Sequence, residues 1–247
     1  SDVYKRQLYN PALVGRDSGN RVLLTPEHYA YLKIAEGCNH KCTFCIIPTM
    51  RGPLASKTLD ELVEEAQALV ENGVKELLLI AQDLSAYGLD RQYGNKSKSA
   101  SSCREDVFTL CKELAGISPW LRLHYVYPYP HVDKLIEMMA EGQILPYLDM
   151  PLQHASPSIL KAMKRPASSE KTLERIQKWR SEIPNLSIRS NFIVGFPGET
   201  ERQFNETRKL LEEHPFHYFH VFPFSPRPGT PANKMEDQVS PETIRDR

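Results

Sequence analysis

Residues 58–82, TLDELVEEAQALVENGVKELLLIAQ, decide the fold class. Thr58 is followed three positions later by Glu61, which is the capping-box pattern of a helix start. An apolar stripe at helical spacing follows and ends at Asn72-Gly73, a typical helix end. Residues 76–82 then form an expected strand around the continuous apolar run 77–81, as strands covered on both faces do. A helix followed directly by such a strand predicts one unit of a parallel α/β sheet.

The same alternation extends over most of the chain. The expected strands are residues 29–35, 76–82, 121–127, 147–152, 186–194 and 218–224. Besides the helix that opens at Thr58, the expected helices are residues 107–114, 132–140, 156–163, 169–183 and 201–213. Such alternation implies parallel strands joined by right-handed crossovers, closed into a barrel or an open part of one. In these folds the chemistry lies at the carboxyl ends of the strands.

Composition and charge exclude several classes of protein. The chain has 247 residues, of which 40% are hydrophobic and 25% charged, as in an ordinary globular protein. No apolar run is long enough to span a membrane, and no signal-peptide pattern is present. Lys plus Arg equals Asp plus Glu at 31 each, so a general attraction for nucleic acid is not indicated. Five cysteines, three of them crowded together, suit a metal site in a reducing compartment, and we expect the cytoplasm.

The ends of the sequence suggest a fragment. Residues 1–7 resemble a translated sequencing adapter, and we interpret them as an artefact. We expect residues 8–27 to be a linker or the tail of an absent amino-terminal domain, and residues 28–235 to form the barrel domain. Residues 236–247 contain a helix start at Ser240-Pro241-Glu242 and are interpreted as the beginning of a truncated carboxyl-terminal segment.

Three cysteines follow the first expected strand in a C-x3-C-x2-C spacing, at Cys38, Cys42 and Cys45. Thiolates this close can wrap one metal centre, and sulfur ligands select zinc, copper(I) or an iron–sulfur cluster. A structural zinc site needs a fourth ligand, which only His40 or the distant Cys103 and Cys111 offer. Three ligands would leave one iron of a cubane open. The alternatives are a zinc knuckle or three unconnected buried cysteines.

With Phe44 before its last cysteine, the motif resembles the signature of the radical S-adenosylmethionine (SAM) superfamily. The resemblance implies a 4Fe-4S cluster held by Cys38, Cys42 and Cys45, which are then both the metal ligands and the catalytic residues. It also implies SAM as cofactor, cleaved by one electron to methionine and a 5′-deoxyadenosyl radical. The implied fold is α/β, a partial (β/α)6 TIM-like barrel, the radical SAM core.

Four further stretches follow expected strands and narrow the resemblance. They are residues 81–88 (AQDLSAYG), 149–156 (DMPLQHAS), 189–200 (RSNFIVGFPGET) and 224–232 (FSPRPGTPA). With the cysteine loop they resemble the methylthiotransferase family over residues 29–232, in the branch that modifies ribosomal protein S-twelve. This implies addition of a methylthio group to the β-carbon of an aspartate, with a second 4Fe-4S cluster in the absent amino-terminal domain.

Three alternative functions remain. They are a tRNA-adenosine methylthiotransferase, a zinc-stabilised binding module and an electron-transfer protein. The methylthiotransferase interpretation further implies an electron donor such as flavodoxin or ferredoxin, no membrane partner and a monomer.

The resemblance also implies SAM-binding residues, namely Phe44, Gln82, Gln153, Arg189, Asn191 and Gly195. Phe44 would pack on adenine, or else be a core aromatic. Gln82 would form a hydrogen bond with the methionine amino group of SAM, or else be a strand-end amide satisfied by the backbone. Arg189 and Gln153 would bind the carboxylate and ribose, or else be paired within the fold. Gly195, near Gly198, would allow close backbone approach to the ligand, or else form a simple turn.

Other conspicuous residues have plainer interpretations. We expect His154 to be a hydrogen-bonded structural residue rather than an acid or base. Residues 217–222, HYFHVF, are expected to be a core strand rather than a metal site. Cys103 and Cys111 are expected to be free thiols. The polar loop at residues 91–105 is expected to be a surface insertion, with a lid or partner contact as the alternative.

Overall fold

The computed structural model describes residues 24–94, 105–165, 171–214 and 216–247. Residues 1–7, most of residues 8–27, Cys103 and most of the loop at residues 91–105 therefore lie outside the described residues. The chain divides into two compact units. Of the described residues, the first unit contains 24–39, 47–94, 105–127 and 131–147, and the second contains 40–46, 128–130, 148–165, 171–214 and 216–247.

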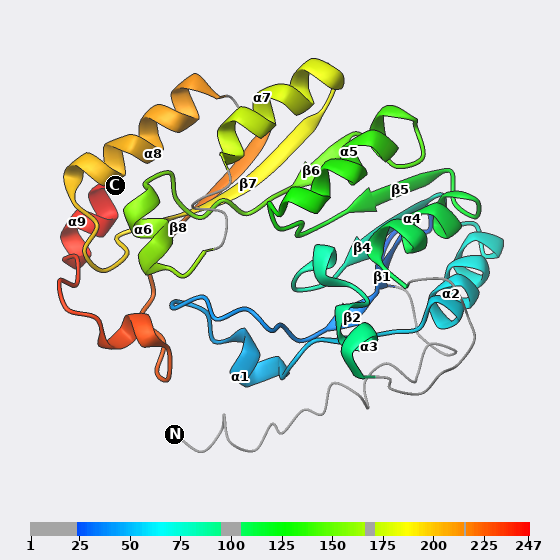
Figure 1. The fold of residues 1–247 in the computed structure, drawn as a ribbon, viewed down its shortest axis with the longest axis horizontal. Helices are drawn as coiled ribbons and strands as arrows, with labels where there is room; N and C mark the ends of the chain where they lie inside the picture. Colours follow the sequence, from blue (N-terminus) through cyan, green and yellow to red (C-terminus); the bar gives the residue numbers. More distant parts are fainter. Residues whose placement is uncertain (1–23, 95–104, 166–170, 215) are drawn as a thin grey trace. The chain divides into compact units, whose positions relative to one another are not determined.

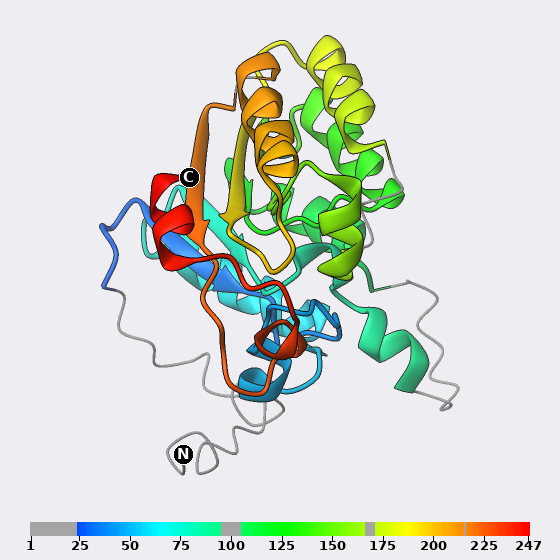
Figure 2. The ribbon, with the colours of Figure 1, turned by 90° about the vertical axis from the view of Figure 1, so that its left-hand side faces the viewer.

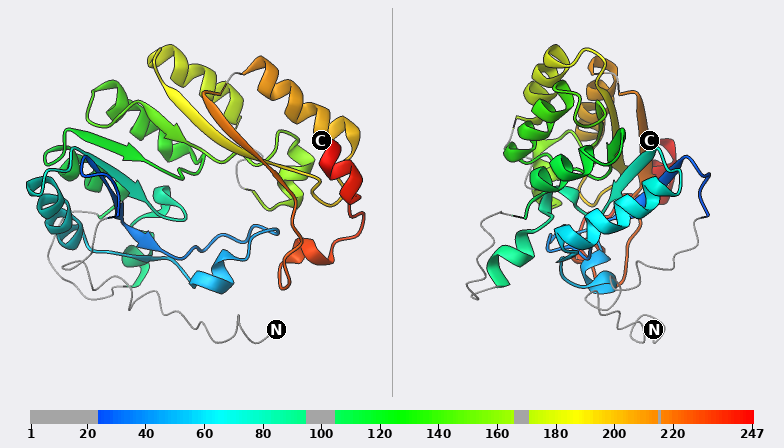
Figure 3. Two further views of the ribbon diagram at one scale, coloured as in Figure 1. Left: turned by 180° about the vertical axis from the view of Figure 1, so that it is seen from behind. Right: turned by 90° about the vertical axis from the view of Figure 1, so that its right-hand side faces the viewer.

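The first unit contains three parallel strands in the order β1 (Tyr29–Lys33), β4 (Glu76–Ile80) and β5 (Trp120–Leu123). A short antiparallel pair, β2 (Ala35–Glu36) with β3 (Ala55–Ser56), follows β1. The helices are α1 (Ile47–Arg51), α2 (Leu59–Glu71), α3 (Leu89–Gly94), α4 (Val107–Ala115) and α5 (Asp133–Ala140). Helix α2 contacts both β1 and α4 (Figures 1 and 3).

The predicted capping box at the start of α2 is confirmed. The Glu61 N–H donates to Thr58 Oγ1 at 3.1 Å, and the Thr58 N–H donates to Glu61 Oε2 at 2.8 Å. The apolar side of the helix then packs inward, with Leu62 fully buried against a sheet whose Leu77 and Leu79 are also fully buried. Local capping and apolar spacing together fix this part of the fold.

The second unit contains β7 (Ser187–Val194) and β8 (Tyr218–Pro223), paired in parallel with Arg189 opposite Tyr218. Strand β6 (Tyr147–Asp149) begins at the last residue of the first unit and precedes β7 in the strand order. The helices are α6 (Pro157–Ala162), α7 (Thr172–Glu182), α8 (Glu201–Glu213) and α9 (Pro241–Asp246). Figure 2 shows α8 running beside β7 and β8.

All six strands expected from the sequence are present, but most of them end earlier than expected. The first ends at Lys33 instead of residue 35, and the third ends at Leu123 instead of residue 127. In the latter case Tyr125 has a φ of 61°, which a continuous strand does not allow.

The expectation that residues 217–222 form a core strand is wrong. A strand forms there, but Tyr218, Phe219, Val221 and Phe222 remain 42–55% exposed. Strand β8 stands at the end of the strand order, so in the described part of the chain it has a neighbouring strand on one side only. Its aromatic side chains contact one another instead, with Tyr218 edge-on to His220 and His220 stacked on Phe222.

Among the described helices, none combines the length and the apolar character that crossing a lipid bilayer requires.

Candidate functional site

Cys38 lies in the first unit, in an extended segment directly after β2. Its N–H donates to the Gly52 carbonyl at 3.1 Å, and the Leu54 N–H donates to Asn39 Oδ1 at 3.0 Å. Gly37 has a φ of 75°, and a Cβ there would lie 2.1 Å from the Pro53 carbonyl oxygen. Only glycine permits this close approach, which holds the partly exposed Cys38 in place.

Cys42 and Cys45 lie in the second unit. The turn between them is closed by the Cys45 N–H donating to the Cys42 carbonyl at 3.1 Å. Thr43 anchors the turn, because its N–H donates to the Met163 carbonyl at 3.1 Å and its hydroxyl to the Ala162 carbonyl at 2.9 Å. Cys42 is buried, with Arg165 Nη1 4.0 Å from its sulfur.

Phe44 packs beside this turn. Its ring contacts an apolar cluster formed by Ile159, Met163, Ile193, Phe196, Phe224 and Ala232. Phe44 itself is only partly buried, so one part of the ring rests on the core and another part remains accessible. Both roles considered for Phe44, a core aromatic and a surface for a planar base, are compatible with this position.

Gln82 lies just after β4 in the first unit, at the carboxyl end of the strand as predicted. Its Nε2 donates to Glu36 Oε1 at 2.9 Å. Its Oε1 is buried and has no hydrogen-bond partner among the described residues. The alternative that the backbone satisfies the Gln82 amide is therefore not what the structure shows, because the amide NH2 donates to the carboxylate of Glu36.

Glu36 is the centre of this polar group and was not singled out from the sequence. It is only 5% exposed, contacts Lys33 and accepts from the Gly37 N–H at 3.3 Å. Burial acts to raise the pKa of Glu36, but Lys33, the Gly37 N–H and Arg51, 3.7 Å away, outweigh it and lower the pKa. A glutamate immediately after an apolar strand was the available signal.

In the second unit, some of the predicted SAM-binding residues already form hydrogen bonds within the protein, and others keep a polar atom without a partner among the described residues. Asn191 lies in β7, and its buried Oδ1 has no hydrogen-bond partner among the described residues. Gln153 has a φ of 72° and exchanges backbone hydrogen bonds with β7, donating to Asn191 at 2.8 Å and accepting from Ile193 at 2.7 Å.

Arg189 also lies in β7, and its Nη1 is 2.5 Å from Oδ2 of the fully buried Asp149. The structural pairing considered for Arg189 is therefore present. Asp149 belongs to one of the quoted motifs, but no role was predicted for it from the sequence.

Gly195 lies in a crowded turn rather than beside open space. It has a φ of 77°, and a Cβ there would lie 2.3 Å from the side chain of Ile244 in α9. Its N–H already donates to Glu199 Oε2 at 2.6 Å. The atoms closest to Gly195 in this structure therefore belong to Ile244 and Glu199 of the protein. This environment is compatible with the alternative that Gly195 forms a simple turn.

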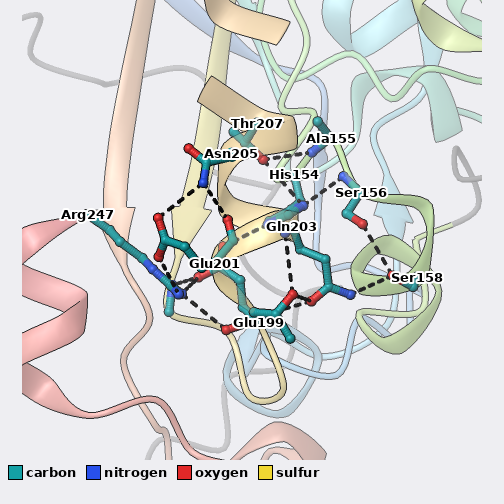
Figure 4. A network of polar contacts seen from close by, with 12 residues as sticks. His154, Ala155, Ser156, Ser158, Glu199, Glu201, Gln203, Asn205, Thr207 and Arg247 are labelled. Carbon is teal, nitrogen blue, oxygen red and sulfur yellow. Dashed lines mark hydrogen bonds and ion pairs between the residues drawn. The ribbon is translucent and has the colours of Figure 1, made fainter. Parts of the chain in front are cut away.

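Glu199 connects this turn to a buried network (Figure 4). Its carboxylate lies 2.8 Å from His154 Nε2 and 2.6 Å from Arg247 Nη1. The Ser156 N–H donates to His154 Nδ1 at 2.9 Å, so the neutral ring carries its proton on Nε2, which donates to Glu199. Burial acts to raise the pKa of Glu199, but His154, the Gly195 N–H and Arg247 outweigh it and lower the pKa. His154 is the buried, hydrogen-bonded residue expected from the sequence.

The described residues contain no three His, Cys, Asp or Glu side chains already gathered as a metal site. The donor set nevertheless fits an iron–sulfur cluster. It consists of three cysteines on one loop, one of them beside a guanidinium, with no carboxylate among them. Cys111 does not belong to this loop, since it lies in α4. It is fully buried there, and burial raises the pKa of its thiol to about 12.

The family model of the radical SAM superfamily matches residues 32–211. The chain therefore belongs to the radical SAM superfamily, which confirms the class predicted from the cysteine motif.

The curated relatives are more specific. Proteins named ribosomal protein uS12 methylthiotransferase RimO are similar to the chain at 56% identity in Histophilus somni and 52% in Rhodopseudomonas palustris. These matches cover 91% and 98% of this chain but 52% and 55% of the relatives. The chain thus spans about half the length of the curated relatives it matches.

Solved structures agree on the fold. The radical SAM methyltransferase TsrM from Kitasatospora setae, solved with cobalamin and a [4Fe-4S] cluster, has a TM-score of 0.63 at 14% identity. That match covers 83% of this chain and 38% of TsrM. Methylornithine synthase has a TM-score of 0.56 at 12% identity, and the match covers 86% of this chain and 58% of the synthase. The predicted α/β fold, a partial TIM-like barrel, is confirmed.

Proposed function

We propose that this chain is the SAM-cleaving part of a methylthiotransferase that modifies the β-carbon of an aspartate in ribosomal protein S-twelve. The relatives at 52–57% identity carry the name of that activity. Because the chain spans about half of their length, the complete reaction is assigned to the whole protein and the cleavage of SAM to this chain.

The cysteine loop is the observation that carries the proposal. Cys38, Cys42 and Cys45 would hold a 4Fe-4S cluster through their thiolates. Three protein ligands would leave one iron open to SAM, and the cluster, when bound, would supply the electron for its cleavage. The protein's own contribution is to fix the loop, through the Gly52 carbonyl at Cys38 and the Met163 carbonyl at Thr43. Arg165 also holds this part of the loop, because its Nη1 donates to the Cys42 sulfur at 4.0 Å.

Of the six residues proposed to bind SAM, two have a buried oxygen that is suited to accept a hydrogen bond from the ligand, and four have less direct support. Gln82 and Asn191 each keep a buried acceptor oxygen without a partner among the described residues, as a residue that receives a ligand N–H or O–H does. Phe44 would support adenine with its accessible part. Gln153, Arg189 and Gly195 remain in the proposed set, although the side chain of Arg189 and the N–H of Gly195 already have partners within the fold.

The proposal extends to the surroundings of the enzyme. We infer a monomer in the cytoplasm that receives electrons from a small carrier such as flavodoxin or ferredoxin, because reductive cleavage of SAM needs a one-electron donor. The second 4Fe-4S cluster, which would handle sulfur, is assigned to a part of the protein outside this chain.

Anaerobic reconstitution of the chain tests the cluster. We expect about four irons per chain and formation of methionine and 5′-deoxyadenosine when dithionite and SAM are added. Cys42→Ala should lose both the iron and SAM cleavage, whereas Cys111→Ala should keep both, because Cys111 is a buried residue of α4 and not part of the cysteine loop. A colourless preparation with one zinc per chain would refute the proposal and favour the zinc-stabilised module.

The full-length protein tests the substrate. Mass spectrometry should find a methylthio group on an aspartate of S-twelve, and tRNA incubated in parallel should stay unmodified. Modification of tRNA alone would replace the proposed substrate by that of the tRNA-modifying branch.

A further inference from the structure

Glu36 and Gln82 are 46 positions apart in the sequence, but their side chains are in contact within the first unit. Gln82 Nε2 donates to Glu36 Oε1 at 2.9 Å, and the same oxygen accepts from the Gly37 N–H at 3.3 Å. Both residues flank loops of the proposed site, since Glu36 precedes Cys38 by two residues and Gln82 follows β4. The contact therefore ties the two loops together.

This contact decides which end of the Gln82 amide is available. A carboxylate only accepts hydrogen bonds, so the amide must turn its NH2 group toward Glu36. The carbonyl oxygen then points away, and it is buried without a hydrogen-bond partner among the described residues. With the amide turned over, two acceptor oxygens would meet, which is unfavourable in a buried place.

The surroundings of Glu36 keep its charge in place. Lys33 contacts the carboxylate, and Arg51 Nη1 lies 3.7 Å from Oε2. A carboxylate that is 6% exposed in its side chain would be costly without such partners. Its ion pairs and the Gly37 N–H leave Glu36 Oε1 with one consistent role, that of acceptor from Gln82.

We propose that Glu36 is a positioning residue that locks the Gln82 amide with its carbonyl oxygen as the acceptor for the amino group of SAM. This inference rests on the proposed function, because it concerns how the same site recognises its cofactor. Glu36 itself does not contact SAM in this proposal, and its effect passes through Gln82. A neutral glutamine at position 36 can turn either its oxygen or its NH2 toward Gln82, so the lock is lost while shape is kept.

Ligand discrimination by the reconstituted chain tests the proposal. The two ligands are S-adenosylhomocysteine, which has the amino group, and its deaminated 2-oxo analogue, which lacks this donor. For Glu36→Gln we expect about tenfold weaker binding of S-adenosylhomocysteine and less than twofold change for the analogue. In a Gln82→Leu background, Glu36→Gln should change neither affinity further, because the acceptor is already absent.

Glu65→Gln is the matched control. Glu65 is a glutamate with the same 6% side-chain exposure, paired with Lys57 at 2.7 Å, and Gln82 is not among its hydrogen-bond partners. It should cost similar stability but leave the ratio of the two affinities unchanged.

Two results would overturn the positioning role. Glu36→Gln could weaken both ligands equally, or it could weaken neither. A wild-type chain that binds neither ligand would instead overturn the proposed function, and the inference with it.

Discussion

The buried carboxylate of Glu199 gives the sharpest prediction for stability. It receives three hydrogen bonds, from the Gly195 N–H at 2.6 Å, His154 Nε2 at 2.8 Å and Arg247 Nη1 at 2.6 Å. In Glu199→Gln one oxygen becomes an NH2 group. If the NH2 replaces Oε1 it meets the Nε2–H of His154, and if it replaces Oε2 it meets the donors of Gly195 and Arg247. Either orientation of the new amide leaves buried donors facing each other.

The expected cost follows from these contacts. A buried donor left without an acceptor costs about 1–3 kcal/mol. Arg247, whose side chain is 7% exposed, also loses the buried carboxylate that balances its charge. Breaking a buried ion pair on one side typically costs about 3–5 kcal/mol, so we expect Glu199→Gln to lower the free energy of unfolding by about 3–5 kcal/mol.

Urea unfolding followed by far-ultraviolet circular dichroism measures this loss, with Glu201→Gln as control. Glu201 also pairs with Arg247, at 3.3 Å, but it is 70% exposed, and such exposed pairs contribute less than about 1 kcal/mol. Because the pKa of Glu199 is lowered in the folded chain, its stabilisation is complete above the unfolded value of 4.5 and is lost as pH falls through the lower folded value. The gap between wild type and Glu199→Gln should therefore be constant near neutral pH and shrink below pH 4.5. Equal effects of the two substitutions would refute the reasoning.

Three further predictions follow from packing and burial. Phe196→Ala should lower the free energy of unfolding by about 3–5 kcal/mol, and Phe222→Ala by under about 1 kcal/mol, because Phe196 is fully buried and Phe222 is 48% exposed; equal losses in urea unfolding would contradict this. Gly37→Ala should prevent cluster incorporation or destabilise the chain, because its Cβ would lie 2.1 Å from a carbonyl oxygen; unchanged iron content and melting temperature would contradict it. Cys111 should resist iodoacetamide in the native chain and react on unfolding, because burial raises its pKa to about 12; rapid native labelling, mapped by mass spectrometry, would argue otherwise.

Elements governed by local interactions could be predicted from the sequence. Helix α8 has the predicted bounds, Glu201–Glu213, and α2 has the predicted capping box at Thr58 and Glu61. Both depend on residues within one or two turns of each other. The exposure of β8 could not be predicted in the same way. Its aromatic composition is that of a core strand, but the burial of its side chains depends on which distant parts of the chain pack over the faces of the strand, and composition does not show this.

The buried acids were missed for a related reason. Glu36, Asp149 and Glu199 each depend on partners 40–48 positions away, namely Gln82, Arg189 and Arg247. An acidic residue near a strand end is usually solvated, so the sequence alone favours the wrong environment. All three lie inside or beside the stretches that carry the family resemblance, which shows that those stretches build the scaffold as well as the proposed site.

Because the same stretches of sequence form the scaffold and the proposed site, the proposed SAM-binding residues differ in how much each contributes to ligand binding and how much to stability. A buried carbonyl oxygen without a partner costs about 1–3 kcal/mol, and a ligand that donates to it recovers that free energy. Gln82 and Asn191 retain such oxygens in the described part of the chain, whereas Arg189 is engaged by Asp149 and the Gly195 N–H by Glu199. Substitution at Gln82 or Asn191 should therefore weaken SAM binding more than it changes stability, and substitution at Arg189 should do the reverse. The motif alone assigns all four residues to one cofactor. Their hydrogen bonds show that Arg189 and Gly195 also hold the fold, whereas Gln82 and Asn191 each keep a buried oxygen without a partner among the described residues.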